Sequence, residues 1–126
     1  TSTKFTVADG AWVNGSGSDY IAMLFASVEG ISKVGYYTGT GADQTITTGF
    51  QPRFVFIKRA DSGENGFVLD TTRGWASGND NYLIINSNAA QASADFGNPV
   101  STGFFVKGTN SATNTNTGKY IYYAHA

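Results

Sequence analysis

Two parts of the chain repeat each other about 100 residues apart, and this repeat limits the folds that the chain can adopt. The matching pairs are 2–7 (STKFTV) with 101–106 (STGFFV), Asn14 with Asn114, and 20–26 (YIAMLFA) with 120–126 (YIYYAHA). The offset is 99 residues for the first pair and 100 for the other two, so we expect one inserted residue in a loop before Asn114. A fixed offset is typical of stacked modules, which are more often structural or binding proteins than free-standing enzymes.

The repeat also predicts how the chain is divided. We expect residues 31–126 to form one module. Residues 1–30 would then be the C-terminal strands of a preceding module plus a connector, and they either pack with the main module or complete a neighbour.

The composition favours an all-β fold. Hydrophobic residues make up 40% of the 126 residues and aromatic residues 14%, which is enough to fill a core. Charged residues reach only 13%, and there are 16 glycines among many Thr, Ser and Asn. Good helix formers are sparse, whereas turn residues and β-branched residues are common. We predict an antiparallel β-sandwich, similar to a jelly roll.

Short apolar or alternating segments, separated by glycine, predict nine strands. These are 4–7, 20–25, 31–37, 44–48, 54–59, 66–70, 82–86, 103–107 and 120–126. The run Phe54–Ile57 is apolar on both faces and predicts a central strand. The turn-forming residues 61–66 predict a hairpin that joins this strand to the next.

The last predicted strand, 120–126, is largely apolar or aromatic on both faces. It should therefore lie inside a sheet that other protein covers on both sides, and an assembly interface could provide one cover. The polar, low-complexity stretch Thr109–Thr117 predicts an exposed loop.

The charge balance bears on the partners. Eight basic and nine acidic residues leave a net charge of −1, so we expect no nucleic-acid partner. The chain has no run of eighteen apolar residues, and we expect no membrane insertion. It also has no cysteine, so disulfides cannot contribute to its stability.

Candidate catalytic residues are few. The single histidine, His125, lacks the companion ligands that a zinc site needs, and it stands where the first copy has Phe25, so we interpret it as a packed or interface aromatic. No pair of carboxylates is placed as a glycosidase requires, and no Ser–His–acid set is visible. We expect no cofactor, no metal and no catalysis.

One segment has the composition of a shallow glycan site, in which an aromatic ring packs on a sugar and polar side chains bind its hydroxyls. Its candidate ligand-binding residues are Asp70, Arg73, Trp75, Asn79, Asp80 and Tyr82. Two structural alternatives stay open. Asp70 and Arg73 form an ion pair that fixes the loop, or Trp75 packs on a neighbouring subunit.

The order of several short motifs resembles a repeated domain of bacteriophage tail-fibre and other virion-associated proteins. The motifs are VGYYTGTG (34–41), GFQPRFVFIKR (49–59), DTTRG (70–74), YLIIN (82–86), STGF (101–104) and GKYIY (118–122). The resemblance implies a location on the virion surface and attachment to a host polysaccharide or receptor. It brings no settled catalytic set with it.

Two functions follow as hypotheses. The first is a non-catalytic, tail-fibre-like module that binds a host surface glycan or protein. The alternative is a self-assembling subunit of an extracellular fibre or filament, in which copies associate as a trimer or a fibre through strand exchange or head-to-tail packing.

Overall fold

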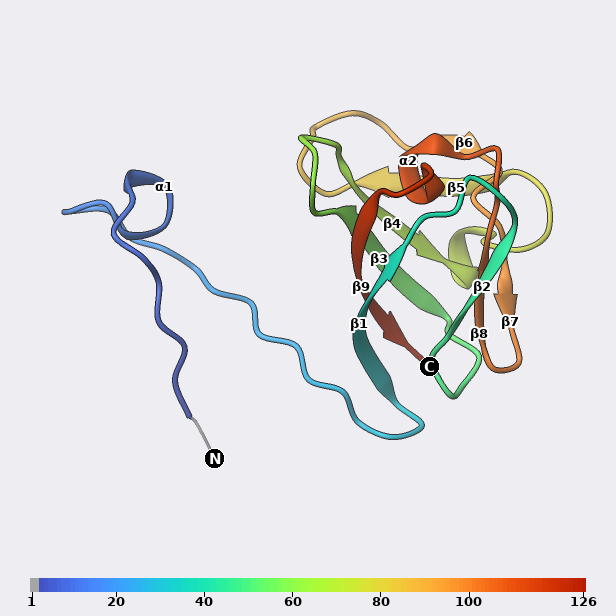
Figure 1. Ribbon diagram of the computed structural model, residues 1–126, viewed down its shortest axis with the longest axis horizontal. Helices are drawn as coiled ribbons and strands as arrows, with labels where there is room; N and C mark the ends of the chain where they lie inside the picture. The colour runs from blue at the N-terminus through green and yellow to red at the C-terminus, as the bar shows by residue number, and fades with distance from the viewer. Residues whose placement is uncertain (1–2) are drawn as a thin grey trace.

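The computed structural model describes residues 3–126, which form a two-sheet domain preceded by an extended arm (Figure 1). The strands are β1 (Ser32–Thr38), β2 (Gln44–Thr47), β3 (Phe54–Arg59), β4 (Gly66–Asp70), β5 (Asp80–Ile84), β6 (Ala92–Ala94), β7 (Pro99–Val100), β8 (Gly103–Val106) and β9 (Lys119–His125). Three short helices complete the fold: α1 (Ala11–Asn14), the 3₁₀ helix η1 (Thr71–Arg73) and α2 (Ser111–Asn114).

The two sheets confirm the predicted antiparallel β-sandwich. One sheet has six strands in the order β1-β9-β3-β4-β5-β6, and the other has three in the order β2-β8-β7. Every paired strand is antiparallel to its neighbour. Buried hydrophobic side chains from both sheets form one core, which comprises Tyr37, Ile46, Val55, Ile57, Phe67, Leu69, Trp75, Phe96, Phe104, Val106, Tyr120, Tyr122 and Ala124.

Strand β9 lies in the interior of the six-stranded sheet, as the sequence predicts. It pairs with β1 on one side and with β3 on the other. Because side chains alternate along a strand, Tyr120, Tyr122 and Ala124 share the face that is buried in the core. The ring of Tyr122 lies so close to Gly35, its partner residue in β1, that any side chain at that position would collide with it.

The predicted hairpin is also confirmed. Strands β3 and β4 pair from Phe54 opposite Asp70 to Lys58 opposite Gly66. Val55 and Ile57 point into the core, whereas Phe54 and Phe56 point to the other face of the sheet. The apolar run therefore marks a central strand because both of its faces contact other side chains.

The predicted strands at 4–7 and 20–25 are wrong. Within the arm, which we define as residues 3–26, the structure has α1, a turn at 16–17 and no strand pairing. Figure 1 shows the arm standing apart from the two sheets. A strand needs a partner for its backbone N–H and C=O groups. The edges of β1 and β3 that would suit the arm are already paired with β9.

The connector is a tight turn at the start of β1. Val28 forms an isolated bridge with Ser32, and the hydroxyl of Ser32 donates to the carbonyl of Ala26 over 2.8 Å. The end of β9 lies beside this turn, because the N–H of Ala126 donates to the carbonyl of Ile31 over 2.9 Å.

The predicted exposed loop at 109–117 is wrong as well. It contains α2, in which Thr113 and Asn114 are fully buried. The side chain of Asn110 caps the helix by accepting the N–H of Ala112 over 3.1 Å. Asn114 accepts the backbone N–H of Thr40 over 3.0 Å and donates to the carbonyl of Ala42 over 2.8 Å. A polar stretch can therefore be a buried part of the fold when its side chains form hydrogen bonds with backbone groups.

Candidate interaction surface

The six residues of the predicted glycan site share one region, but most of them support the fold. The carboxylate of Asp70 caps η1 by accepting the N–H of Arg73 over 2.8 Å, and it also lies 2.8 Å from the Nε atom of Arg73. The Arg73 guanidinium in addition contacts the side-chain oxygen of Gln91 at 3.2 Å. This geometry corresponds to the structural alternative, in which an ion pair fixes the loop.

Trp75 does not present a face to a ligand. Its side chain is 2% exposed, and its indole N–H donates to the carbonyl of Gly97 over 3.0 Å. The ring packs at 6.4 Å from that of Phe104 in the core. The prediction of a stacking platform at Trp75 is therefore wrong, and so is the alternative of packing on a neighbouring subunit. A large apolar ring with one satisfied N–H is a normal core residue.

Asp80 links two loops from a fully buried position. Its carboxylate accepts the N–H of Ala76 over 3.0 Å and the N–H of Phe96 over 2.9 Å. Burial raises the pKa of the Asp80 carboxyl, and these two hydrogen bonds oppose that shift in part. The predicted role of Asp80 as a sugar ligand is wrong, because both of its oxygens face the protein backbone.

Tyr82 and Asn79 complete the predicted set. Tyr82 is half-buried, with its ring 5.7 Å from Phe67 and 4.9 Å from Phe96. Asn79 is exposed in the turn before β5. The structure thus brings Asp70 and Arg73 together and places Trp75 and Asp80 in the interior. The six side chains do not converge on one open surface.

The single histidine forms a local contact. The Nδ1 atom of the exposed His125 lies 3.1 Å from the hydroxyl of Tyr123. Among residues 3–126, no three His, Asp or Glu side chains come close enough to hold a metal ion. In the same residues, no helix has both the length and the apolar character needed to cross a membrane.

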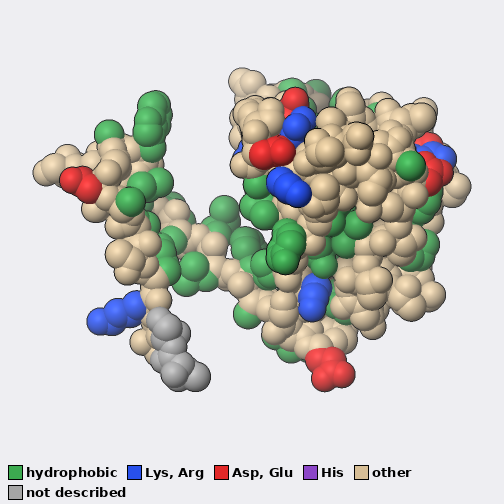
Figure 2. Space-filling model, viewed as in Figure 1, with side chains coloured by type: hydrophobic (Ala, Val, Ile, Leu, Met, Phe, Trp, Pro, Cys, Tyr) green, Lys and Arg blue, Asp and Glu red, His purple; other side chains and the backbone are tan. Residues whose placement is uncertain are grey.

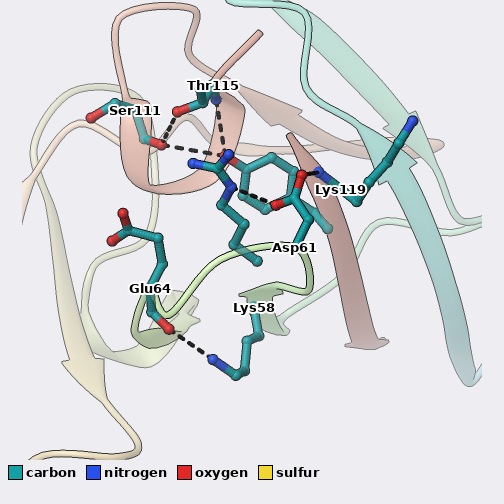
Figure 3. A network of polar contacts seen from close by, with 8 residues as sticks. Lys58, Asp61, Glu64, Ser111, Thr115 and Lys119 are labelled. Atoms are coloured by element: carbon teal, nitrogen blue, oxygen red, sulfur yellow. Dashed lines mark hydrogen bonds and ion pairs between the residues drawn. The ribbon is translucent and has the colours of Figure 1, made fainter. Parts of the chain in front are cut away.

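A polar network ties the β3–β4 turn to the start of β9 (Figure 3). The carboxylate of Asp61 lies 2.6 Å from the Nε atom of Arg59 and accepts the backbone N–H of Lys119 over 3.1 Å. The Arg59 guanidinium and this N–H hold the pKa of Asp61 below its usual value. In the same turn, the ammonium of Lys58 donates to the carbonyl of Glu64 over 2.7 Å.

The face of the six-stranded sheet that points away from the core carries apolar side chains across five strands. We call this the outer face, and it comprises Val34, Tyr36, Phe54, Phe56, Val68, Leu83, Ile85, Ile121 and Tyr123. Tyr36 is 85% exposed and Ile121 47% exposed. One continuous row runs Val34, Tyr123, Phe56, Val68, Leu83 through the registers of neighbouring strands.

The end of the arm lies against part of this face. The ring of Phe25 packs 4.5 Å from that of Tyr123. A groove of about 410 Å³ lies between Met23 and Phe25 of the arm and the side chains of the outer face. The prediction that β9 has apolar side chains on both faces is confirmed, whereas an assembly partner for its second face stays a prediction.

The arm itself exposes many large hydrophobic side chains. Trp12 is 94% exposed and Ile21 is 95% exposed. The others are Phe5, Val7, Val13, Tyr20, Met23, Leu24 and Phe25. Figure 2 shows hydrophobic side chains along the arm and on the side of the domain nearest to it. A soluble monomer rarely leaves so much contiguous apolar surface open unless it binds other protein.

The arm also has a defined local structure around Tyr20. The hydroxyl of Tyr20 donates to the carbonyl of Ala11 over 2.9 Å and accepts the N–H of Gly15 over 2.8 Å. The helix α1 begins after Gly10, whose carbonyl accepts the N–H of Asn14 over 2.8 Å. A few residues later the chain takes a left-handed conformation at Gly17, with φ of 76°.

The same local structure occurs 100 residues later, around Tyr120 (Figure 3). The hydroxyl of Tyr120 donates to the carbonyl of Ser111 over 3.3 Å and accepts the N–H of Thr115 over 3.0 Å. The N–H of Asn114 bonds to the carbonyl of Asn110 over 2.9 Å. Thr117 takes the left-handed conformation with φ of 65°. Residues 11–20 therefore share this set of hydrogen bonds with residues 111–120, although only their Asn and Tyr residues match in sequence.

The sequence reveals only part of this surface. The repeat identifies the matching Asn and Tyr residues but not the helix that ends at each Asn, because 11–14 and 111–114 share only their last residue. The outer face had a detectable signal, namely that 54–57 and 120–126 carry apolar residues on both faces of their strands.

Comparison with known proteins gives one match. The model of a family described as a domain of unknown function (DUF7483) matches residues 1–126. No curated protein and no solved structure matches the chain.

Proposed function

The chain belongs to the DUF7483 family, and we propose that it is a non-catalytic building block of an extended surface assembly. In this role the domain binds other modules of its own kind. The observation that carries the proposal is the outer face, an apolar surface spread over five strands and only partly covered by the arm. Apolar faces of this size are typical of surfaces that bind other protein.

The proposal favours assembly over host recognition as the primary act of the domain. The aromatic anchor expected for a host polysaccharide, Trp75, lies in the core. The resemblance to tail-fibre domains supports a place on the virion surface, within a trimer or fibre. A host receptor contacted by other parts of such an assembly stays a prediction of that resemblance.

Association in solution tests the proposal. We expect the chain to self-associate in multi-angle light scattering as its concentration rises, because burial of the outer face removes apolar area from water. Tyr36→Lys and Ile121→Lys should abolish the association, since each places a charge on that face.

Thr45→Lys is the matched control, because Thr45 is exposed on a strand of the other sheet. It should leave the association unchanged. A chain that remains monomeric up to about 1 mM, where binding is worth only about −4 kcal/mol, would contradict the proposal. Equal effects of all three substitutions would contradict the assignment to the outer face.

A further inference from the structure

The arm has the local structure of the segment that closes the sheet domain, but within residues 3–126 no sheet receives it. In residues 111–125, the local structure around Tyr120 is held by contacts with the rest of the fold. The side chain of Asn114 bonds to Thr40, Ala42, Gln44 and Lys107, and all of these bonds lie between 2.8 and 3.2 Å. In the arm, Asn14 has the same place in the same local structure, but it is exposed.

The domain of this chain cannot accept the arm. The position between β1 and β3 is occupied by β9 along its whole length, from Lys119 to His125. A strand in that position gains hydrogen bonds on both of its edges, so only an unfilled site of the same kind would bind residues 20–25 equally well.

The inward-facing side chains of the arm differ from those of β9. By the offset of 100 residues, Ala22 corresponds to Tyr122 and Leu24 to Ala124. Ala124 is fully buried and Tyr122 nearly so. In this domain, Leu24 would overfill the position of Ala124, and Ala22 would leave a cavity in the position of Tyr122.

A second mismatch lies in the segment that corresponds to β8. By the offset of 99 residues, Lys4 stands where β8 has Gly103. Any side chain at position 103 would collide with the carbonyl of Ile46 in β2. A second copy of this chain would therefore reject residues 20–25 in the place of its β9, and it would reject residues 3–7 if they replaced its β8.

We infer that the arm is the closing segment of a related but non-identical sheet unit, which lacks a strand between its counterparts of β1 and β3. Residues 20–25 enter that sheet in the manner of β9, with Tyr20, Ala22 and Leu24 toward its core. Asn14 then binds the backbone of that unit as Asn114 binds its own.

The fit specifies the partner. Its core is wider than the present one where it receives Leu24, and narrower where it receives Ala22. Gly35 has no side chain because the ring of Tyr122 lies over it. The partner unit, which receives Ala22 there, has room for a side chain at its counterpart of Gly35.

Exchange of the inward-facing residues between the two segments of the full chain tests the inference. The variant Tyr122→Ala/Ala124→Leu gives β9 the pattern of the arm. We expect its melting temperature to fall by roughly 10 °C or more, because it combines a cavity with an overpacked position. The matched control, Ala22→Tyr/Leu24→Ala, should melt like the wild type.

The variant with all four substitutions gives residues 20–25 the inward-facing side chains that fit this domain, and gives β9 side chains that do not fit it. We expect each molecule to insert its arm into the next. Its mass in light scattering should rise several-fold with concentration, and its melting temperature should recover toward the wild-type value.

A peptide of residues 11–26 carrying Ala22→Tyr and Leu24→Ala should likewise raise the melting temperature of Tyr122→Ala/Ala124→Leu, whereas the unmodified peptide should not.

Three results would overturn the inference. The first is a four-fold variant without oligomers, together with a modified peptide that has no effect. The second is a Tyr122→Ala/Ala124→Leu variant with wild-type stability. The third is a wild-type chain that oligomerises in a way that Tyr20→Ala abolishes, since the partner would then be a second copy.

The arm can be tested separately from the outer face. Tyr36→Lys in the four-fold background should leave the oligomers intact, because they form through residues 20–25. Loss of the oligomers on this substitution would assign them to the outer face and would count against the role of the arm.

Discussion

Residues 11–20 and residues 111–120 share a set of local hydrogen bonds in opposite surroundings. Around Tyr120, α2 contributes two buried residues, and β9 is paired on both of its edges within the six-stranded sheet. Around Tyr20, the same helix and the same hydroxyl contacts stand largely in solvent. The helix–hydroxyl motif is thus encoded locally. Strand formation in contrast depends on the neighbours, because only the second segment has partners for its backbone.

The comparison predicts that equivalent substitutions have unequal effects. The largest difference is expected for the two tyrosines. Tyr120→Ala removes a buried ring that stacks on Tyr37 at a centroid distance of 5.0 Å, and should lower the free energy of unfolding by about 3–5 kcal/mol. Tyr20→Ala should leave it unchanged. Urea denaturation of both variants measures the difference, and equal losses would break the comparison.

The two asparagines should differ by a smaller amount. Asn114→Ala removes a buried side chain and leaves the N–H of Thr40 and the carbonyl of Ala42 without this partner, so it should cost about 1–3 kcal/mol. Asn14→Ala, in the exposed copy, serves as the control. Thermal unfolding of both variants measures the difference. A melting temperature of Asn114→Ala equal to that of the wild type would contradict the expectation.

Placing the residue of the arm at the matching position of the domain should stabilise the domain at position 113. The hydroxyl of Thr113 is buried and has no hydrogen-bond partner among residues 3–126, and the arm has Val13 at the matching position. Thr113→Val keeps the shape and removes the unsatisfied group, so we expect a gain of about 1–2 kcal/mol in the free energy of unfolding. Thr113→Ser, which keeps the hydroxyl, should bring no gain. A loss of stability in the valine variant would show that the hydroxyl has a partner.

A second substitution of this kind, at position 117, should have a smaller effect on the stability of the domain. Thr117 has φ of 65°, a strained conformation for a β-branched residue, whereas the arm has Gly17 there with φ of 76°. Thr117→Gly should stabilise the domain by up to about 1 kcal/mol, because relief of strain exceeds the added entropy of the unfolded chain. Thr117→Ala, which retains a Cβ atom, should gain less. Calorimetric melting temperatures distinguish the two.

The smallest expected effect concerns the carboxylate of Asp61, which contacts the start of β9. Because the folded-state pKa of Asp61 lies below its unfolded value, its contribution to stability is present above about pH 4 and is lost as pH falls through the folded-state pKa. Asp61→Asn should therefore be slightly less stable than wild type at pH 6, and equally stable at pH 2. Asp19→Asn, at the arm position that matches Lys119, should show no difference at either pH. A constant difference for Asp61→Asn at all pH values would refute this assignment.

The sequence predicts the strands that are apolar on both faces. Phe54–Ile57 and its hairpin with 66–70 appear where expected, because burial on two sides leaves a continuous apolar run. Strand β6, Ala92–Ala94, gives no such signal, since Ala-Ser-Ala fits equally well in a loop. The false strand at 20–25 has the pattern of a strand but no strand partner among residues 3–126.

The direction of a side chain was harder to predict than the strand. Trp75 lies among Gly, Ser, Asn and Asp residues, a composition that suits both a ligand loop and a loop folded over a core. Its burial depends on Gly97 and Phe104, both distant in the sequence. Likewise, the helix at 111–114 depends on the cap from Asn110 and on the contacts of Asn114, not on any helical period.

The hydrogen bond from Ala126 to Ile31 also has a geometric consequence for a string of such units. If Ala26 ends the last strand of a neighbouring unit as Ala126 ends its own, only Ser27–Gly30 separates one sheet from the next. Four residues reach at most about 14 Å when fully stretched. Consecutive units would then lie close together and could change their relative orientation only a little. A series of such units would form a stiff rod with a short, regular spacing.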